Sequence, residues 1–153
     1  MIQKTLIEHA FFSELAPEHL SELVQAARER HFADGDMIFR QDEQADHFYL
    51  IISGEACVEI PSIYGPPLVV QTLGAGQLLG WSWLIPPYKW HFEARANSDL
   101  DVIEFDGARL RERCEQEPAL GYQLLKRFAA LMSDRVQAAR FKMMEVVEPT
   151  QIV

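Results

Sequence analysis

The placement of the glycines constrains the fold more than any other feature of this chain. Six of the eight lie between residues 31 and 105, where they separate short runs rich in Val, Ile, Phe, Tyr and Leu: Gly35, Gly54, Gly65, Gly74, Gly76 and Gly80. Glycine permits the positive backbone angles of tight turns, and turn signals at such intervals are typical of antiparallel sheets. We therefore predict a β sandwich or barrel over residues 31–105.

Three runs within this region indicate individual strands. The run HFYLII (47–52) is apolar on both faces, which is typical of a buried strand. In EACVEI (55–60) the apolar residues alternate with Glu55, Cys57 and Glu59, so we expect these three side chains to share a face in contact with water. The run 60–70 is expected to form a hairpin, since Gly65, Pro66 and Pro67 cannot continue a ladder.

Helical periodicity flanks this β region on both sides. Apolar residues recur every three or four positions over 14–30, and again along a segment that Pro118 opens. The 153 residues are expected to form one domain, helical over 1–30, β over 31–105 and helical over 106–145. We expect the last residues, 145–153, to fray.

Charge and cysteine content exclude several classes of protein. The net charge is -9, the wrong sign for a protein that neutralises DNA phosphates non-specifically. Two cysteines, Cys57 and Cys114, are too few for a disulfide framework and favour a reducing cytoplasm. We find no signal peptide and no apolar run long enough to span a membrane. No catalytic motif and no cofactor-binding motif appears, so we expect neither catalysis nor a cofactor.

Several residues at fixed spacing resemble a known family. Residues 32–60 resemble the front half of the cyclic nucleotide-binding domain, at Phe32, Gly35, Ile38, Phe39, Asp46, Tyr49, Ile51 and Gly54. TLGAGQLLG (72–80) resembles the turn before that family's phosphate-binding cassette, and a looser match continues past Leu120. The resemblance implies a mainly β fold, an eight-stranded jelly-roll-like β-roll (a double-stranded β-helix) with N-terminal helices and a long C-terminal helix. It also implies a small-ligand pocket under a short helix that begins near Gly80.

Two recognition groups of that family are replaced in this chain. In the family, a Glu beside the cassette glycine binds the ribose and an Arg binds the phosphate; counted from Gly80 without a gap, these positions hold Trp81 and Trp90. Losing a charge-assisted contact removes ~1.5–3 kcal/mol of binding free energy, and losing a neutral hydrogen bond removes ~1 kcal/mol more. Together these losses lower the affinity by roughly two orders of magnitude. A slip of one residue would place Lys89 in the Arg role. The candidate ligand-binding residues are Gly80, Trp81, Ser82, Trp83, Lys89, Trp90 and His91.

The altered cassette leaves four hypotheses open. Its five rings, from Trp81, Trp83, Tyr88, Trp90 and Phe92, can simply fill a disused pocket. They can instead form a stacking site for a different planar ligand, with Lys89, His91 or Arg95 meeting an anionic group. A third hypothesis is genuine binding of cyclic AMP or cyclic GMP. A fourth is a small metal-dependent β-barrel enzyme that uses His91 and Glu93, although such a site needs further histidines.

We favour a non-catalytic sensor domain that binds a non-standard small ligand or a protein partner. The C-terminal helix carries a wide apolar stripe, and surplus apolar surface can mark a subunit interface. In the family, the corresponding helix pairs two subunits and leads to a DNA-binding helix-turn-helix. Here we expect no direct DNA binding, because few residues follow that helix. Homodimerisation and packing of the whole stripe on the β-roll both remain open.

Overall fold

The computed structural model describes residues 2–146 and confirms a mainly β fold flanked by helices. The chain begins with three short helices, α1 (Ile2–Glu8), α2 (Ala10–Ser13) and α3 (Pro17–Gln25). Eight strands follow: β1 (Ala27–Phe32), β2 (Met37–Phe39), β3 (His47–Ser53), β4 (Ala56–Ile60), β5 (Leu68–Leu73), β6 (Leu78–Leu79), β7 (Glu93–Ala96) and β8 (Leu100–Asp106). Helices α4 (Gly107–Gln116) and α5 (Pro118–Val146) complete the described chain.

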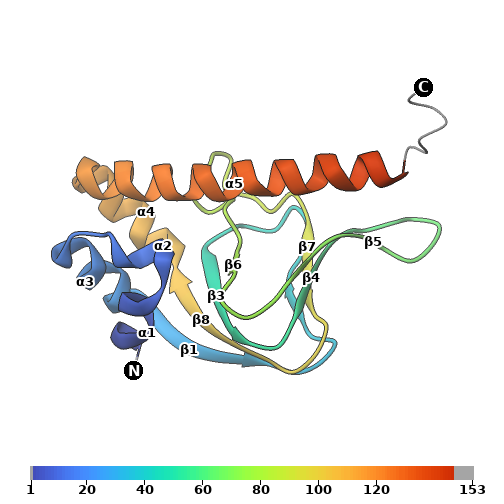
Figure 1. Ribbon diagram of the computed structural model, residues 1–153, viewed down its shortest axis with the longest axis horizontal. Helices are drawn as coiled ribbons and strands as arrows, with labels where there is room; N and C mark the ends of the chain where they lie inside the picture. The colour runs from blue at the N-terminus through green and yellow to red at the C-terminus, as the bar shows by residue number, and fades with distance from the viewer. Residues whose placement is uncertain (1, 147–153) are drawn as a thin grey trace.

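The strands form two antiparallel sheets that face each other as a β-roll (Figure 1). One sheet has the order β1-β8-β3-β6 and the other β2-β7-β4-β5, so every neighbouring pair except β4 and β5 is non-consecutive in sequence, as in a jelly roll. The predicted hairpin over 60–70 is confirmed, since β4 and β5 pair with Ala56 opposite Leu73 and Ile60 opposite Leu68. This hairpin projects from the roll beneath the C-terminal half of α5.

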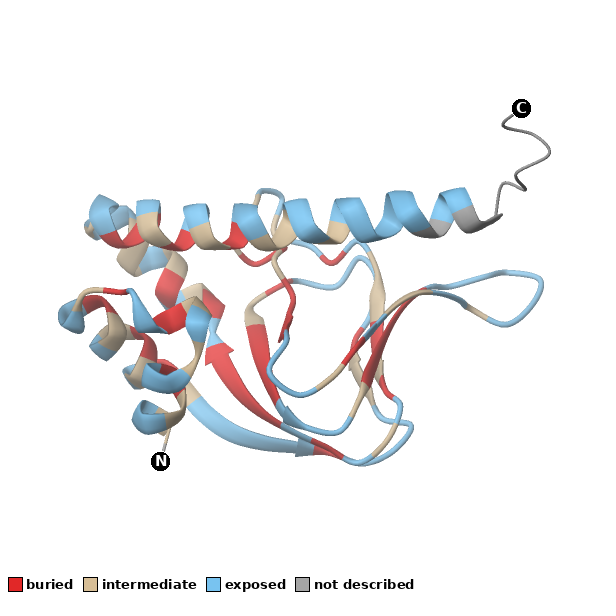
Figure 2. Ribbon diagram, in the orientation of Figure 1, coloured by how far each residue is buried: buried red, intermediate tan, exposed pale blue. Residues whose placement is uncertain are grey.

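Helix α5 lies across the roll and the N-terminal helices, and its burial changes along its length (Figure 2). Its first half packs Leu120, Leu124 and Phe128 into the core. Its second half exposes large apolar side chains, with Val136 58% and Phe141 64% exposed. The apolar stripe of α5 is therefore buried in the core along its first half and largely exposed along its second half. Within residues 2–146, no helix is both long and apolar enough to cross a bilayer.

The N-terminal helix ends earlier than the sequence predicts. We expected helix through residue 30, but α3 stops at Gln25 and residues 27–32 form β1. The cause is tertiary: β1 pairs with β8, and the guanidinium groups of Arg28 and Arg30 both bind the carboxylate of Glu104, which is 1% exposed. Burial raises the pKa of Glu104, and the hydrogen bonds from Arg30 and Arg28 outweigh it and hold that pKa below its usual value.

The face of β4 that we expected to be wet is covered. Glu59 is 4% exposed and Cys57 is 8% exposed, on a strand that lies between β5 and β7. The guanidinium Nε of Arg95 on β7 donates to Glu59 Oε1 at 2.9 Å. The prediction of fraying falls partly on residues 145 and 146, whose backbone continues α5, and otherwise on residues 147–153, which lie outside the described residues.

Candidate functional site

The segment between β6 and β7 replaces the expected short helix with turns. Gly80 has a φ of +97°, which turns the chain out of β6, and two successive turns follow, closed by Leu84 N to Trp81 O (3.2 Å) and Ile85 N to Ser82 O (3.3 Å). Pro86 stops this winding, because the residue before a proline is disfavoured in helical conformation. This segment therefore lacks the helix N-terminus that binds phosphate in the family.

Trp83 belongs to the hydrophobic core. Its side chain is fully buried, stacks on Phe48 with ring centroids 4.8 Å apart and meets the Phe128 ring edge-on at 5.5 Å. The backbone here is held by Arg111 of α4, whose guanidinium donates to the carbonyl of Trp83 at 2.6 Å and to Asp46 Oδ1 at 3.2 Å. For this ring the hypothesis of a filled pocket describes the structure.

Trp90 forms a wall beside Gly80. Its indole is 5% exposed and stacks on Phe39 with centroids 3.7 Å apart and planes 9° apart. A Cβ added at Gly80 would lie 2.8 Å from Cη2 of this indole, so glycine is required here for contact as well as for its positive φ. Lys89 is exposed and its backbone forms an isolated bridge with Gln44.

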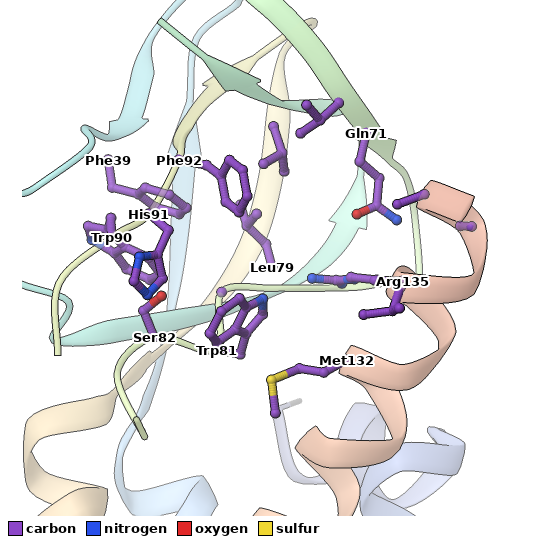
Figure 3. A pocket seen from close by; sticks show the side chains of 16 residues that line it. Phe39, Gln71, Leu79, Trp81, Ser82, Trp90, His91, Phe92, Met132 and Arg135 are labelled. Carbon is purple, nitrogen blue, oxygen red and sulfur yellow. The ribbon is translucent and has the colours of Figure 1, made fainter. Parts of the chain in front are cut away.

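A cavity of about 620 Å³ lies between these rings, the β2-β7-β4-β5 sheet and α5 (Figure 3). Five of the seven predicted site residues line it, namely Gly80, Trp81, Ser82, Trp90 and His91. Trp83 and Lys89 do not, and Arg95 does not either, since it pairs with Glu59. The other lining residues, which the sequence analysis did not select, are Phe39, Val58, Val70, Gln71, Leu79, Phe92, Met132, Arg135, Val136, Ala138 and Ala139.

Half-buried Trp81 and exposed His91 stand together at the cavity wall, with ring centroids 5.6 Å apart and planes tilted by 33°. The rings of Trp81, Trp90 and Phe92 thus line a space and do not fill it. Cavities of roughly 300–1,000 Å³ with apolar and aromatic walls are typical of sites for small organic ligands. These walls can surround a small organic molecule that has an aromatic or apolar body.

The cavity has one charged side chain that sequence reasoning missed. Arg135 extends from α5 toward the centre of the cavity (Figure 3), and its guanidinium donates to the backbone carbonyl of Leu78 on β6. Burial lowers the pKa of Arg135 to about 10. The available signal was position: Arg135 lies seven residues after Phe128 and three after Met132, on the face of α5 that packs on the roll.

The hypothesis of a metal-dependent enzyme gains no support from the site. His91 lines the cavity and Glu93 begins β7. Across residues 2–146, no three His, Cys, Asp or Glu side chains gather closely enough to hold a metal ion. Cys57 is buried, and Cys114 is half-buried, where burial raises the pKa of its thiol to about 11.

Comparison with known proteins places this fold and cavity in a family. The model of the cyclic nucleotide-binding domain matches residues 29–117. The chain belongs to the cyclic nucleotide-binding domain family. It is a family of regulatory domains that bind small ligands, and the matched residues include the segment between β6 and β7.

Solved structures support the assignment. A candidate cyclic nucleotide-binding protein from Geobacter metallireducens GS-15 is 31% identical, with a TM-score of 0.81, over 89% of this chain and 98% of that one. The sensor domain of the transcriptional regulator DNR from Pseudomonas aeruginosa is 22% identical, with a TM-score of 0.70, over 89% of this chain and 91% of that one, and this likeness shows the fold alone.

A curated relative is a candidate potassium channel protein from Rhodopseudomonas palustris (strain ATCC BAA-98 / CGA009). It is 25% identical over 114 residues, which cover 74% of this chain and 27% of that protein. The chain therefore corresponds to about a quarter of that relative's length.

Proposed function

We propose that this member of the family is a non-catalytic sensor domain whose altered cassette binds a small planar ligand other than cyclic AMP or cyclic GMP. The observation that carries the proposal is that two indoles, Trp81 and Trp90, line the cavity. By the ungapped count from Gly80, these residues stand where the family has its Glu and Arg. An indole cannot accept the ribose hydrogen bond, and it cannot form two parallel hydrogen bonds to a phosphate.

The size and chemistry of the cavity support a ligand in place of a filled pocket. Its walls are mostly apolar, which favours an aromatic body, and the half-buried ring of Trp81 offers an aromatic surface for it. The net charge of -9 also favours a small-molecule or protein partner over DNA.

Titration calorimetry with cyclic AMP and cyclic GMP tests the altered recognition. The expected result is no binding in the low micromolar range, because both recognition groups are replaced. Dissociation constants at or below about 10 μM, that is binding free energies of roughly -7 kcal/mol or better, would overturn the proposal. The neutral dye N-phenyl-1-naphthylamine tests whether the cavity binds a planar ligand. Its fluorescence should rise on binding, and Ala139→Leu, which narrows the cavity, should weaken that binding.

We further propose that the chain forms a homodimer through α5. The exposed flank of this helix carries apolar residues at alternating spacings of four and three, the repeat of a two-stranded coiled coil: Leu125, Ala129, Met132, Val136, Ala139 and Met143. A second helix with the same repeat can cover such a stripe along its length, and a second copy of this chain supplies one.

Light scattering on the purified protein tests this interface. The wild type is expected to be a dimer, and Leu125→Glu and Met143→Glu are each expected to shift it toward the monomer. Phe141→Glu is the matched control, since Phe141 is 64% exposed, as Met143 is 67% exposed, but lies off the repeat. A monomeric wild type, or equal effects of all three substitutions, would refute the interface.

A further inference from the structure

The cavity is free of acidic side chains in a strongly acidic protein. None of the Asp and Glu residues that the structure describes lines it, and its two ionisable lining residues are His91 and Arg135. A cavity that carries positive charge and no negative charge attracts anions, and its low-dielectric walls strengthen that attraction.

Arg135 retains donors for a ligand. A guanidinium has five N–H donors in a planar arrangement that matches a carboxylate or another flat anionic group. The donation to the Leu78 carbonyl occupies one side of the group, and no carboxylate within residues 2–146 forms an ion pair with it. Because burial alone lowers its pKa, the charge has lost water without gaining a counter-ion.

The other cations near the cassette are not available in the same way. Arg95 pairs with Glu59 at 2.9 Å, and Arg111 binds Asp46 and the carbonyls of Ala45 and Trp83. Lys89 is exposed and does not line the cavity. Arg135 is therefore the cation positioned to meet a ligand held beside Trp81 and Trp90.

We propose that Arg135 is the anion-binding residue of this cavity, so that the ligand is a flat aromatic compound carrying a carboxylate or a similar anionic group. This inference rests on the proposed function, because it assigns the charge of the same ligand. The counter-charge comes from α5 and not from the cassette. A bound anion therefore connects α5 to the roll directly and stabilises the packing of the helix across the cavity.

Two dyes with the same ring system isolate the charge. The probe is 8-anilinonaphthalene-1-sulfonate, and its matched control is N-phenyl-1-naphthylamine, which lacks the sulfonate. Both are titrated by fluorescence into the full chain and into Arg135→Met, Arg135→Lys and Arg140→Met. Arg140 lies on the same helix, is exposed and does not line the cavity, so its substitution controls for net charge. Circular dichroism checks that each variant is folded.

The wild type is expected to bind the sulfonate more tightly than the neutral dye. Arg135→Met should weaken sulfonate binding by about ten- to a hundredfold, the loss of one charge-assisted contact, and leave the neutral dye nearly unaffected. Arg135→Lys should keep much of the preference, and Arg140→Met should keep all of it. Equal weakening of both dyes would indicate a structural role in holding Leu78 and would overturn the proposal.

The remaining outcomes separate this inference from the proposed function. If both dyes bind equally to the wild type, or if Arg135→Met keeps the preference for the sulfonate, the role of Arg135 is refuted and the aromatic cavity stands. If neither dye binds, the proposed planar-ligand site fails and this inference fails with it. If Arg135→Met does not fold, the comparison of Arg135→Lys with the wild type decides: complete loss of the preference with the charge retained refutes a charge-based role.

Discussion

The substitution Gly80→Ala tests the packing that forms the cavity wall. Gly80 has a φ of +97°, and a Cβ at this position would lie 2.8 Å from Cη2 and 3.0 Å from Cζ3 of the Trp90 indole. The indole cannot move away easily, because it is 5% exposed and stacks on Phe39 at 3.7 Å. The added methyl group therefore meets two separate costs, one in the backbone and one in the contact with Trp90.

The two costs have separate magnitudes. A non-glycine residue at this positive φ costs about 1–3 kcal/mol, and forcing a methyl group into packed side chains costs about 1–3 kcal/mol more. Gly76→Ala is the matched control: its φ is +84°, but nothing lies within 4 Å of the added Cβ. We expect the control to lose only the backbone part, so that Gly80→Ala is less stable than Gly76→Ala by about 1–3 kcal/mol.

Urea unfolding followed by tryptophan fluorescence measures both variants. Replacing Trp90 by Leu should remove much of the additional loss at Gly80, and the double-mutant cycle of Gly80→Ala with Trp90→Leu gives that coupling directly. Equal stability of Gly80→Ala and Gly76→Ala, or a coupling energy of zero, would show that the contact between Gly80 and Trp90 is not rigid. The description of Trp90 as a fixed wall would then be wrong.

Three further predictions test other parts of the structure. Arg111→Met leaves the carbonyl of Trp83 and the carboxylate of Asp46 without this donor, so the free energy of unfolding in urea should fall by about 1.5–3 kcal/mol. An unchanged free energy of unfolding would contradict the role of Arg111 in holding the cassette. Phe128→Ala should lower the free energy of unfolding by about 3–5 kcal/mol, because Phe128 packs on Phe48 and Trp83. Phe141→Ala, on the exposed part of α5, should change it by no more than about 0.5 kcal/mol. Similar losses for both variants would contradict the difference in burial between the two halves of the helix. The hydrogen bond to Asp101 raises the pKa of His31 and lowers that of Asp101, so the stabilisation by this pair is lost as pH rises through the raised His31 pKa and as pH falls through the lowered Asp101 pKa. The pH-dependent part of the stability difference between wild type and His31→Asn should therefore disappear above the raised His31 pKa, and a difference that does not change with pH would refute the linkage.

The sequence predicts the β-roll well because its turns and strands depend on local signals. Glycine positions and alternating apolar residues mark β3, β4 and the β4–β5 hairpin, and Pro118 marks the start of α5. Strand β1 was missed because its residues, ARERHF, have high helix propensity and no strand alternation. Pairing with β8 and the burial of Glu104 decide its conformation, and both depend on residues 68 to 78 positions away.

The candidate site was predictable only in part, for a related reason. Counting along the cassette selected Trp81 and Trp90, because their positions relative to Gly80 are local. It also selected Trp83 and Lys89, since the direction of a side chain in an irregular loop does not follow from spacing. Arg135 was missed because an apolar periodicity is counted over apolar residues and passes over an arginine on the same face. Its spacing from Phe128 and Met132 was the available signal, and the packing of Leu124 and Phe128 turns that face of α5 to the roll.

Helix α5 brings the proposed ligand and the proposed dimer to the same side chains. Met132, Val136 and Ala139 line the cavity and also lie on the coiled-coil repeat, and Val136 is 58% exposed, so the cavity is open on the flank where a second helix would pack. A second copy would therefore cover residues that also contact the ligand. Two binding events that share side chains must be thermodynamically linked, and the linkage is reciprocal. Ligand affinity should consequently differ between the monomer and the dimer, and so depend on protein concentration across the dimerisation range. The ligand should change the dimerisation constant by a factor fixed by this ratio of affinities.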